Sequence, residues 1–276
     1  MKFAALALPL LFAATSATGA DADTALGTFK SQTVTLDAKS AVAFRGPSSF
    51  DKSDALIVAV INARVRSDAI ADYTDRRRVI DKRVKDGATG VVYFEFKPDG
   101  TYRGMSYYFG PGNGCGYCTG ETTSTVKLVG GMLSGKLKET GTDRSFDITL
   151  VAPVLSDAHG AALPADGGAP GRAYLDYHAA LVKADRGALK PLLSQDQQEY
   201  WASTEKDGNG GGFLHALAGQ HPNKSVRITQ GFGTADKAVI LFTGESTAGK
   251  VVGEALLLKQ DGTWRVDDEI TELAAP

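Results

Sequence analysis

The sequence predicts an α+β protein with two domains. Residues 21–157 contain apolar and β-branched runs separated by glycine-containing turns, with one helix-like segment, which predicts an antiparallel sheet carrying one helix. Residues 172–276 have the opposite order, because helical segments come first and strand-like segments with tight turns follow. The stretch 158–171 is rich in Gly and Pro and has no periodicity, which is typical of a flexible linker.

The first 20 residues have the pattern of a secretory signal peptide. Lys2 precedes an apolar run over residues 3–14, and small residues end at Ala20, as at a signal-peptidase site. A run of about a dozen residues is too short for the roughly 20 that cross a bilayer. We therefore expect a periplasmic or secreted, soluble protein that starts at Asp21 and has no integral membrane segment after cleavage.

The charge balance argues against nucleic-acid binding. Without Lys2 the chain has 29 basic and 32 acidic residues, whereas neutralising phosphates requires a basic excess. The charge is also unevenly distributed, with a net of +1 over residues 21–157 and of −4 over residues 158–276. This difference supports the division into two domains.

The first domain is predicted to begin with strands over residues 33–36 and 41–44. Residues 55–61 form a β-branched run that suits a buried strand, with a helix as the main alternative. Ser67 is a typical N-cap, and apolar residues then recur at helical spacing as far as about Lys85. They are Ile70, Tyr73, Ile80 and Val84.

Two hairpins and a final strand are expected after this helix. Residues 91–96 and 102–109 flank a Pro98-Asp99-Gly100 turn and form the clearest hairpin of the chain. A second hairpin is centred on Gly130-Gly131, and residues 145–151 form the last strand of the domain.

The predicted helix carries the densest group of basic residues. The i,i+4 pairs Asp72–Arg76 and Asp81–Lys85 favour a solvated helix stabilised by surface ion pairs, and a site for an anionic partner is the alternative. Arg77 is unusual because it falls within the apolar stripe. Its stem either covers apolar surface or carries the guanidinium to an acidic partner.

Cys115 and Cys118 are the only cysteines, in a Cys-Gly-Tyr-Cys sequence that resembles the redox motif of periplasmic disulfide isomerases. A reactive first cysteine usually lies at a helix N-terminus, which lowers the pKa of its thiol. Here the surroundings are glycine-rich and residues 122–129 alternate like a strand. We therefore predict a structural disulfide, with thiol exchange at Cys115 as the alternative.

No cofactor or metal ion is expected from the motifs. Residues 244–250 fit a phosphate-binding loop up to the last position, where Val251 replaces the required Ser or Thr, so a hairpin turn is the better interpretation. No His pair has the i,i+4 spacing of a metal site.

The second domain is predicted to contain helices over residues 172–181, 185–193, 195–203 and 213–218. Strands follow over residues 225–229, 237–243, 250–259 and 262–268, and the last contains Gly-Thr-Trp-Arg-Val-Asp. This order and the closing Trp264 strand resemble the nuclear transport factor 2-like (SnoaL-like) superfamily. The resemblance covers about the last 105 residues. It implies a cone-shaped sheet wrapped on a helix, with an apolar pocket used for catalysis in some relatives and for binding in others.

His178 is the candidate for a polar group that faces this pocket. It shares a helix face with Tyr174 and Leu181, and catalytic members of the superfamily place an acidic or His base among aromatic residues. The alternative is a packed core histidine. His215 and His221 are candidates to join His178 around a metal, without support from their spacing. Residues 267–269 are interpreted as a solvated charge run, and Trp201 and Trp264 as core residues.

Two classes of function follow from this sequence. The first is a non-catalytic envelope protein that binds a small apolar ligand or an envelope protein. The second is an isomerase, cyclase or hydrolase that uses His178 as the base. We favour binding, because the sequence places no second carboxylate or nucleophile near His178.

Overall fold

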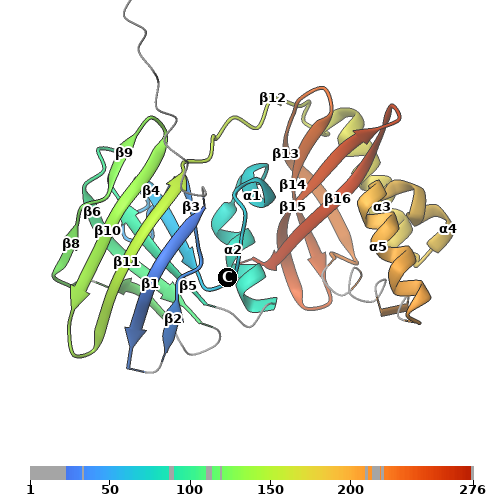
Figure 1. Ribbon diagram of the computed structural model, residues 1–276. Helices are drawn as coiled ribbons and strands as arrows, with labels where there is room; N and C mark the ends of the chain where they lie inside the picture. The colour runs from blue at the N-terminus through green and yellow to red at the C-terminus, as the bar shows by residue number, and fades with distance from the viewer. Residues whose placement is uncertain are drawn as a thin grey trace, which may run out of the picture.

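The computed structural model describes residues 23–32, 34–86, 90–109, 114–118, 120–208, 211–212, 218 and 221–274. The protein is mixed α and β, and its named strands pair antiparallel in three sheets. Figure 1 shows the layers: two sheets, then helices α1 and α2, then the third sheet, then the remaining helices. Within the described part of the chain, no helix is long and apolar enough to cross a membrane. The predicted signal segment, residues 1–20, lies outside the described residues.

The predicted first domain contains two sheets where the sequence predicted one. Sheet A has the order β2-β1-β11-β10-β8 with β9 paired to β10, and sheet B has the order β3-β4-β5-β6-β7. The strands of sheet A are β1 (Thr24–Ser31), β2 (Thr35–Asp37), β8 (Thr122–Ser124), β9 (Lys127–Val129), β10 (Met132–Thr140) and β11 (Arg144–Pro153). Those of sheet B are β3 (Ser40–Pro47), β4 (Asp54–Ile61), β5 (Val91–Phe96), β6 (Tyr102–Tyr108) and β7 (Gly114–Cys118).

Strand β4 is buried on both faces, which explains its unbroken apolar sequence. Leu56 and Val58 point into the core between sheets A and B, whereas Ile57 and Ile61 pack against the helix layer. A strand buried on both sides loses the alternation of a half-exposed strand. The buried strand predicted over residues 55–61 is therefore confirmed, as are the β5–β6 and β9–β10 hairpins and the final strand β11.

The predicted helix is divided into α1 (Asp68–Ala71) and α2 (Arg76–Asp86). The break has a tertiary cause: the backbone N–H groups of Thr74 and Asp75 donate to the Glu254 carboxylate of the second domain, at 2.9 and 3.1 Å. An anion at the first turn of α2 is stabilised by the unpaired N–H groups and the helix dipole. The helix therefore restarts at Arg76.

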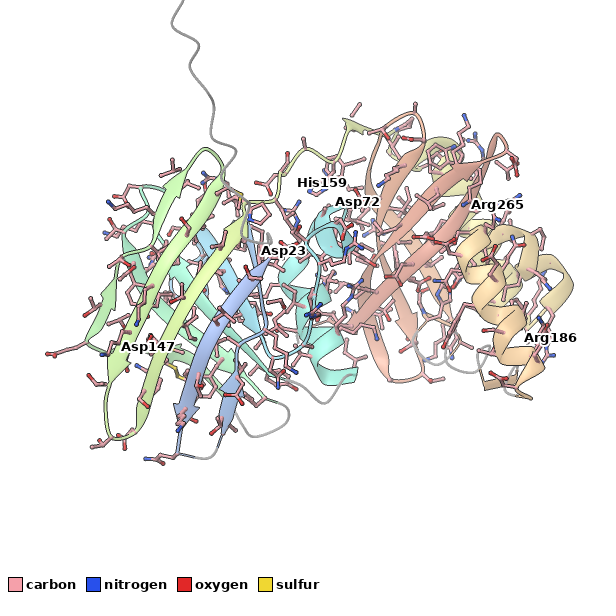
Figure 2. All side chains as sticks on the ribbon, viewed as in Figure 1. Asp23, Asp72, Asp147, His159, Arg186 and Arg265 are labelled. Carbon is pink, nitrogen blue, oxygen red and sulfur yellow. A yellow bond between two sulfur atoms is a disulfide. The ribbon has the colours of Figure 1, made fainter. Side chains whose placement is uncertain are left out.

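The solvated helix face predicted from charge pairs is wrong. Arg76 is 2% exposed, and it donates to Asp157 at 2.8 Å and to the carbonyl of Ala71 at 2.9 Å, not to Asp72. Asp72 instead pairs with Lys237 of the second domain at 2.9 Å; Figure 2 labels Asp72 beside α1. Arg76 is therefore enclosed in the fold, because α1 and α2 lie between two sheets (Figure 1).

The predicted second domain, together with residues 161–171, forms sheet C and the helices on the face of this sheet that is turned away from α1 and α2 (Figure 1). The order in sheet C is β12-β13-β14-β15-β16. Its strands are β12 (Ala161–Ala162), β13 (Ser225–Gly233), β14 (Lys237–Ser246), β15 (Gly249–Gln260) and β16 (Thr263–Leu273). The helices are α3 (Gly168–Val182), α4 (Arg186–Leu189), the 3-10 turn η1 (Lys190–Leu192) and α5 (Gln195–Lys206). The expected order of helices before strands is present, and the β14–β15 turn is a hairpin.

The segment 158–171 carries secondary structure of its own. Ala161 and Ala162 pair with β13, and α3 begins at Gly168, so residues 168–171 belong to its first turn. Gly171 is buried close to Asp166 and Ile228, where a Cβ atom would lie 2.1 Å from the Asp166 carbonyl oxygen. The glycines of this segment therefore allow close packing at the start of α3.

Candidate functional site

His178 lies on α3 and begins a chain of hydrogen bonds inside the second domain. Its Nδ1 is bonded to Nε2 of His221, which precedes β13. Nδ1 of His221 lies 2.6 Å from Oε1 of Glu269 on β16. His221 is 3% exposed, whereas His178 is half-buried. We call these three side chains the histidine chain.

The chemistry of Glu269 fixes the direction of this chain. An ionised carboxylate only accepts hydrogen bonds, so Nδ1 of His221 donates to Glu269. In the neutral ring, Nε2 of His221 is then an acceptor and receives the Nδ1–H of His178. The assignment leaves Nε2 of His178 with a free lone pair, and no other hydrogen-bond partner of His178 occurs among the described residues.

The surroundings keep His178 uncharged. Burial lowers the pKa of His178 to about 4, and the electrostatic influence of the adjacent His221 ring contributes to the same shift. His178 is therefore a neutral acceptor at neutral pH.

Aromatic rings surround the inner part of the chain. The ring centroids of Tyr177 and Tyr174 lie 5.7 and 6.3 Å from that of His221, and Tyr174 stacks on Phe242 at 4.9 Å. Burial, with the nearby Glu269 carboxylate, raises the pKa of both tyrosines well above the usual value, so they remain phenols. The buried Tyr174 hydroxyl has no hydrogen-bond partner among the described residues.

The three pocket candidates occupy different environments. Tyr174 and Leu181 are buried in the apolar cluster between α3 and sheet C, whereas His178 is the half-buried member. Trp201 is buried in the same cluster, and Trp264 packs against it while partly exposed. Of the three, only His178 combines access to solvent with a hydrogen-bonding group.

The solvated charge run predicted over residues 267–269 is wrong. Asp267 is the extra residue of a β-bulge, since Asp268 pairs with Leu256 and Val266 with Leu257. Glu269 faces the helices and holds His221, and Asp268 accepts a hydrogen bond from the Tyr73 hydroxyl of the first domain. Burial raises the pKa of Asp268.

Glu269 is the functional candidate that sequence reasoning missed, and His221 was considered only as a metal-binding partner of His178, not as its hydrogen-bond partner. His221 lies 43 residues after His178, and Glu269 lies 48 residues after His221, so no local spacing links these residues. His215, the other histidine considered, lies outside the described residues. No group of three or more His, Cys, Asp or Glu side chains suited to a metal ion occurs in the described part of the chain.

The predicted disulfide is confirmed and lies in the first domain. Cys115 and Cys118 are bonded to each other on β7, which pairs with β6 at the edge of sheet B. Cys118 is buried in the core between sheets A and B. Cys115 lies on a strand, whereas the first cysteine of an exchange motif usually lies in the first turn of a helix.

Comparison with protein-family models and with curated protein sequences finds no match for this chain. Its function is therefore inferred from the residues described above.

Proposed function

We propose that this is an exported two-domain protein whose second domain binds a small, mainly apolar ligand through a hydrogen bond to His178. For this domain we propose a nuclear transport factor 2-like fold. Three features support that fold: helices α3–α5 precede the strands, an apolar cluster lies between them and sheet C, and β-bulges bend β13 and β16. Figure 1 shows these helices on the side of sheet C that faces away from the first domain.

The disulfide supports export. Disulfides persist in oxidising compartments such as the periplasm and are rare in the cytosol. The Cys115–Cys118 bond therefore agrees with the signal-peptide pattern of residues 1–20.

The histidine chain carries the binding proposal. Glu269 and His221 fix the tautomer and ring orientation of His178, which presents one oriented acceptor next to an aromatic cluster. Small-molecule sites combine apolar walls with a few placed polar groups of this kind. A pKa of about 4 makes His178 a weak base at neutral pH, whereas efficient general bases have pKa values near the working pH. This mismatch favours binding over catalysis.

The test compares two fluorescent probes that differ in one hydrogen-bond donor. 1-Naphthol donates an O–H, and 1-methoxynaphthalene has the same ring system without a donor. We expect 1-naphthol to bind more tightly by about threefold to tenfold, the value of one neutral hydrogen bond. The preference should disappear in His178→Phe and persist in Asp176→Ala, which changes an exposed residue of the same helix. Equal affinity of the two probes for the unmodified protein would contradict the proposal.

General-base catalysis is the second candidate, and the direction of the histidine chain favours it. A proton accepted at Nε2 of His178 allows the Nδ1 proton to pass to His221, whose positive charge is then stabilised by Glu269. Turnover that falls about 100-fold in His178→Phe, while probe binding and thermal stability are retained, would establish this function. Binding without turnover would leave the first proposal standing.

A further inference from the structure

A second pocket lies in the first domain, where the end of β4 meets α1 and α2. Its volume is about 380 Å³, within the range of about 300–1,000 Å³ that is common for small-molecule sites. The inner wall is made by Ile61, Ile80 and Val84, which are almost fully buried. Because these side chains also belong to the core against the helix layer, the wall is rigid and apolar.

Three arginines line the same pocket: Arg64, Arg66 and Arg83. No carboxylate is among the lining residues of this pocket. Six of its nine lining residues are apolar, so the pocket combines an apolar interior with a cationic border. We call it the arginine pocket.

Two of the three guanidinium groups already have anionic neighbours. Arg66 donates from Nε to Asp68 at 3.0 Å. Arg83 donates to the Ala69 carbonyl at 3.0 Å and lies 4.0 Å from the Asp268 carboxylate. Arg64 is exposed and has no hydrogen-bond or ion-pair partner among the described residues. About one positive charge is therefore left uncompensated at the pocket.

We propose that the arginine pocket binds an aliphatic monocarboxylate, with its chain against the apolar wall and its head group at Arg64. The apolar wall requires an apolar chain, and the single uncompensated charge matches one carboxylate better than a phosphate dianion. Arg also offers two parallel donors that fit the two oxygens of a carboxylate. This site is independent of the ligand proposed for the second domain.

The test is isothermal titration calorimetry of the mature protein with decanoate. The decanoate concentration is kept below its critical micelle concentration. We expect one decanoate per chain, bound more weakly as the salt concentration rises, because an exposed ion pair is screened. 1-Decanol, with the same chain length and no charge, should bind about fivefold more weakly, which is the upper value of one exposed ion pair.

Surface variants locate the binding site without disturbing the core. Arg64→Ala should weaken decanoate binding about fivefold, and Arg64→Lys should retain most of it. Ala69→Trp, at an exposed lining residue, should block the pocket. Arg172→Ala is the matched control, because it removes an exposed arginine of α3, which lies across sheet C from α1 and α2 (Figure 1). Thermal unfolding of each variant verifies that it is folded.

Three results would overturn the proposal. The first is an absence of decanoate binding, and the second is equal affinity for decanoate and 1-decanol. The third is an affinity that Arg64→Ala and Ala69→Trp leave unchanged. Loss of decanoate binding in His178→Phe would assign the carboxylate to the second domain and would equally remove it from the arginine pocket.

Discussion

Asp268 and Glu269 are neighbours on β16, yet their carboxylates act on opposite faces of sheet C. Asp268 accepts a hydrogen bond from Tyr73 in the first domain, and Glu269 accepts one from His221 inside the second domain. Successive residues of a strand point to opposite faces, so this division follows from the strand itself. The domain contact and the candidate ligand site therefore share one strand, and a shift of β16 would alter both.

The buried carboxylate of Glu254 is predicted to stabilise the contact between the domains. It is 1% exposed and accepts from the Thr74 hydroxyl at 2.8 Å, as well as from the backbone N–H groups of Thr74 and Asp75. Glu254→Ala leaves these partly buried donors unpaired, and we expect a loss of about 2–4 kcal/mol of unfolding free energy in urea. Glu245→Ala, at an exposed glutamate of the same sheet, should cost less than about 0.5 kcal/mol. Similar losses for both variants would contradict this role.

The titration of His178 is predicted to depend on His221. We expect NMR to show His178 uncharged down to about pH 5, consistent with a pKa of about 4. His221→Phe removes the electrostatic contribution of this ring, so the pKa of His178 should rise toward its ordinary value of 6.5 while burial keeps it below that value.

The same shift makes stability depend on pH in a defined direction. Between pH 6.5 and pH 4 the unfolded chain binds a proton at His178 that the folded protein does not bind. This contribution to stability is therefore complete above pH 6.5 and decreases as the pH falls toward 4. His178→Phe should remove it, and an unchanged slope of unfolding free energy against pH would contradict the assignment.

Arg77 is predicted to control the ionisation of Glu95. Burial raises the pKa of Glu95, but hydrogen bonds from Ser48 and Ser49 and the Arg77 guanidinium, at 2.7 Å, outweigh it, so the pKa lies below its usual value. The stability that the ionised Glu95 carboxylate contributes is present above about pH 4.5 and is lost as the pH falls through the lowered pKa of Glu95. Arg77→Leu should shift acid unfolding to higher pH in a circular-dichroism titration. Arg186→Leu, at an exposed arginine labelled in Figure 2, should leave the pH of acid unfolding unchanged.

The disulfide is predicted to stabilise the protein modestly. Cys115 and Cys118 are three residues apart, and closing so short a loop is worth about 2 kcal/mol in the chain-entropy model. The double variant Cys115→Ser/Cys118→Ser should lose about this amount in urea unfolding, and dithiothreitol should reproduce the loss in the unmodified protein. Insulin-reductase activity that Cys115→Ser abolishes would instead support thiol exchange.

Elements with a local signal were predictable from the sequence. The β5–β6 hairpin has a Pro-Asp-Gly turn between apolar strands, and the buried residues of α3 recur at helical spacing. Strand β1 was missed because only Ala25 and Phe29 are buried along it, while Leu26 is exposed. Two buried residues four apart do not give the period of a strand.

The features that define the candidate site depend on distant contacts. The division between α1 and α2 is caused by Glu254, 180 residues beyond Thr74. The sequence identified His178 as a polar residue on an apolar helix face, but its orientation depends on His221 and Glu269. The sequence contains no signal that links residues so far apart. A helical pattern or a run of charged residues is therefore the same in the sequence whether its side chains are exposed to solvent or buried in the fold.

The position of α1 and α2 between sheets B and C has a consequence for biosynthesis. Ile70 and Tyr73 share a core with Ile270, so the helix layer is not fully covered until nearly the whole chain is available. A chain that emerges from its N-terminus exposes this apolar layer during the synthesis or transport of roughly 200 further residues, an interval in which partly folded chains aggregate. The side of these helices that faces sheet C in the folded protein therefore stays uncovered until β16 has been made.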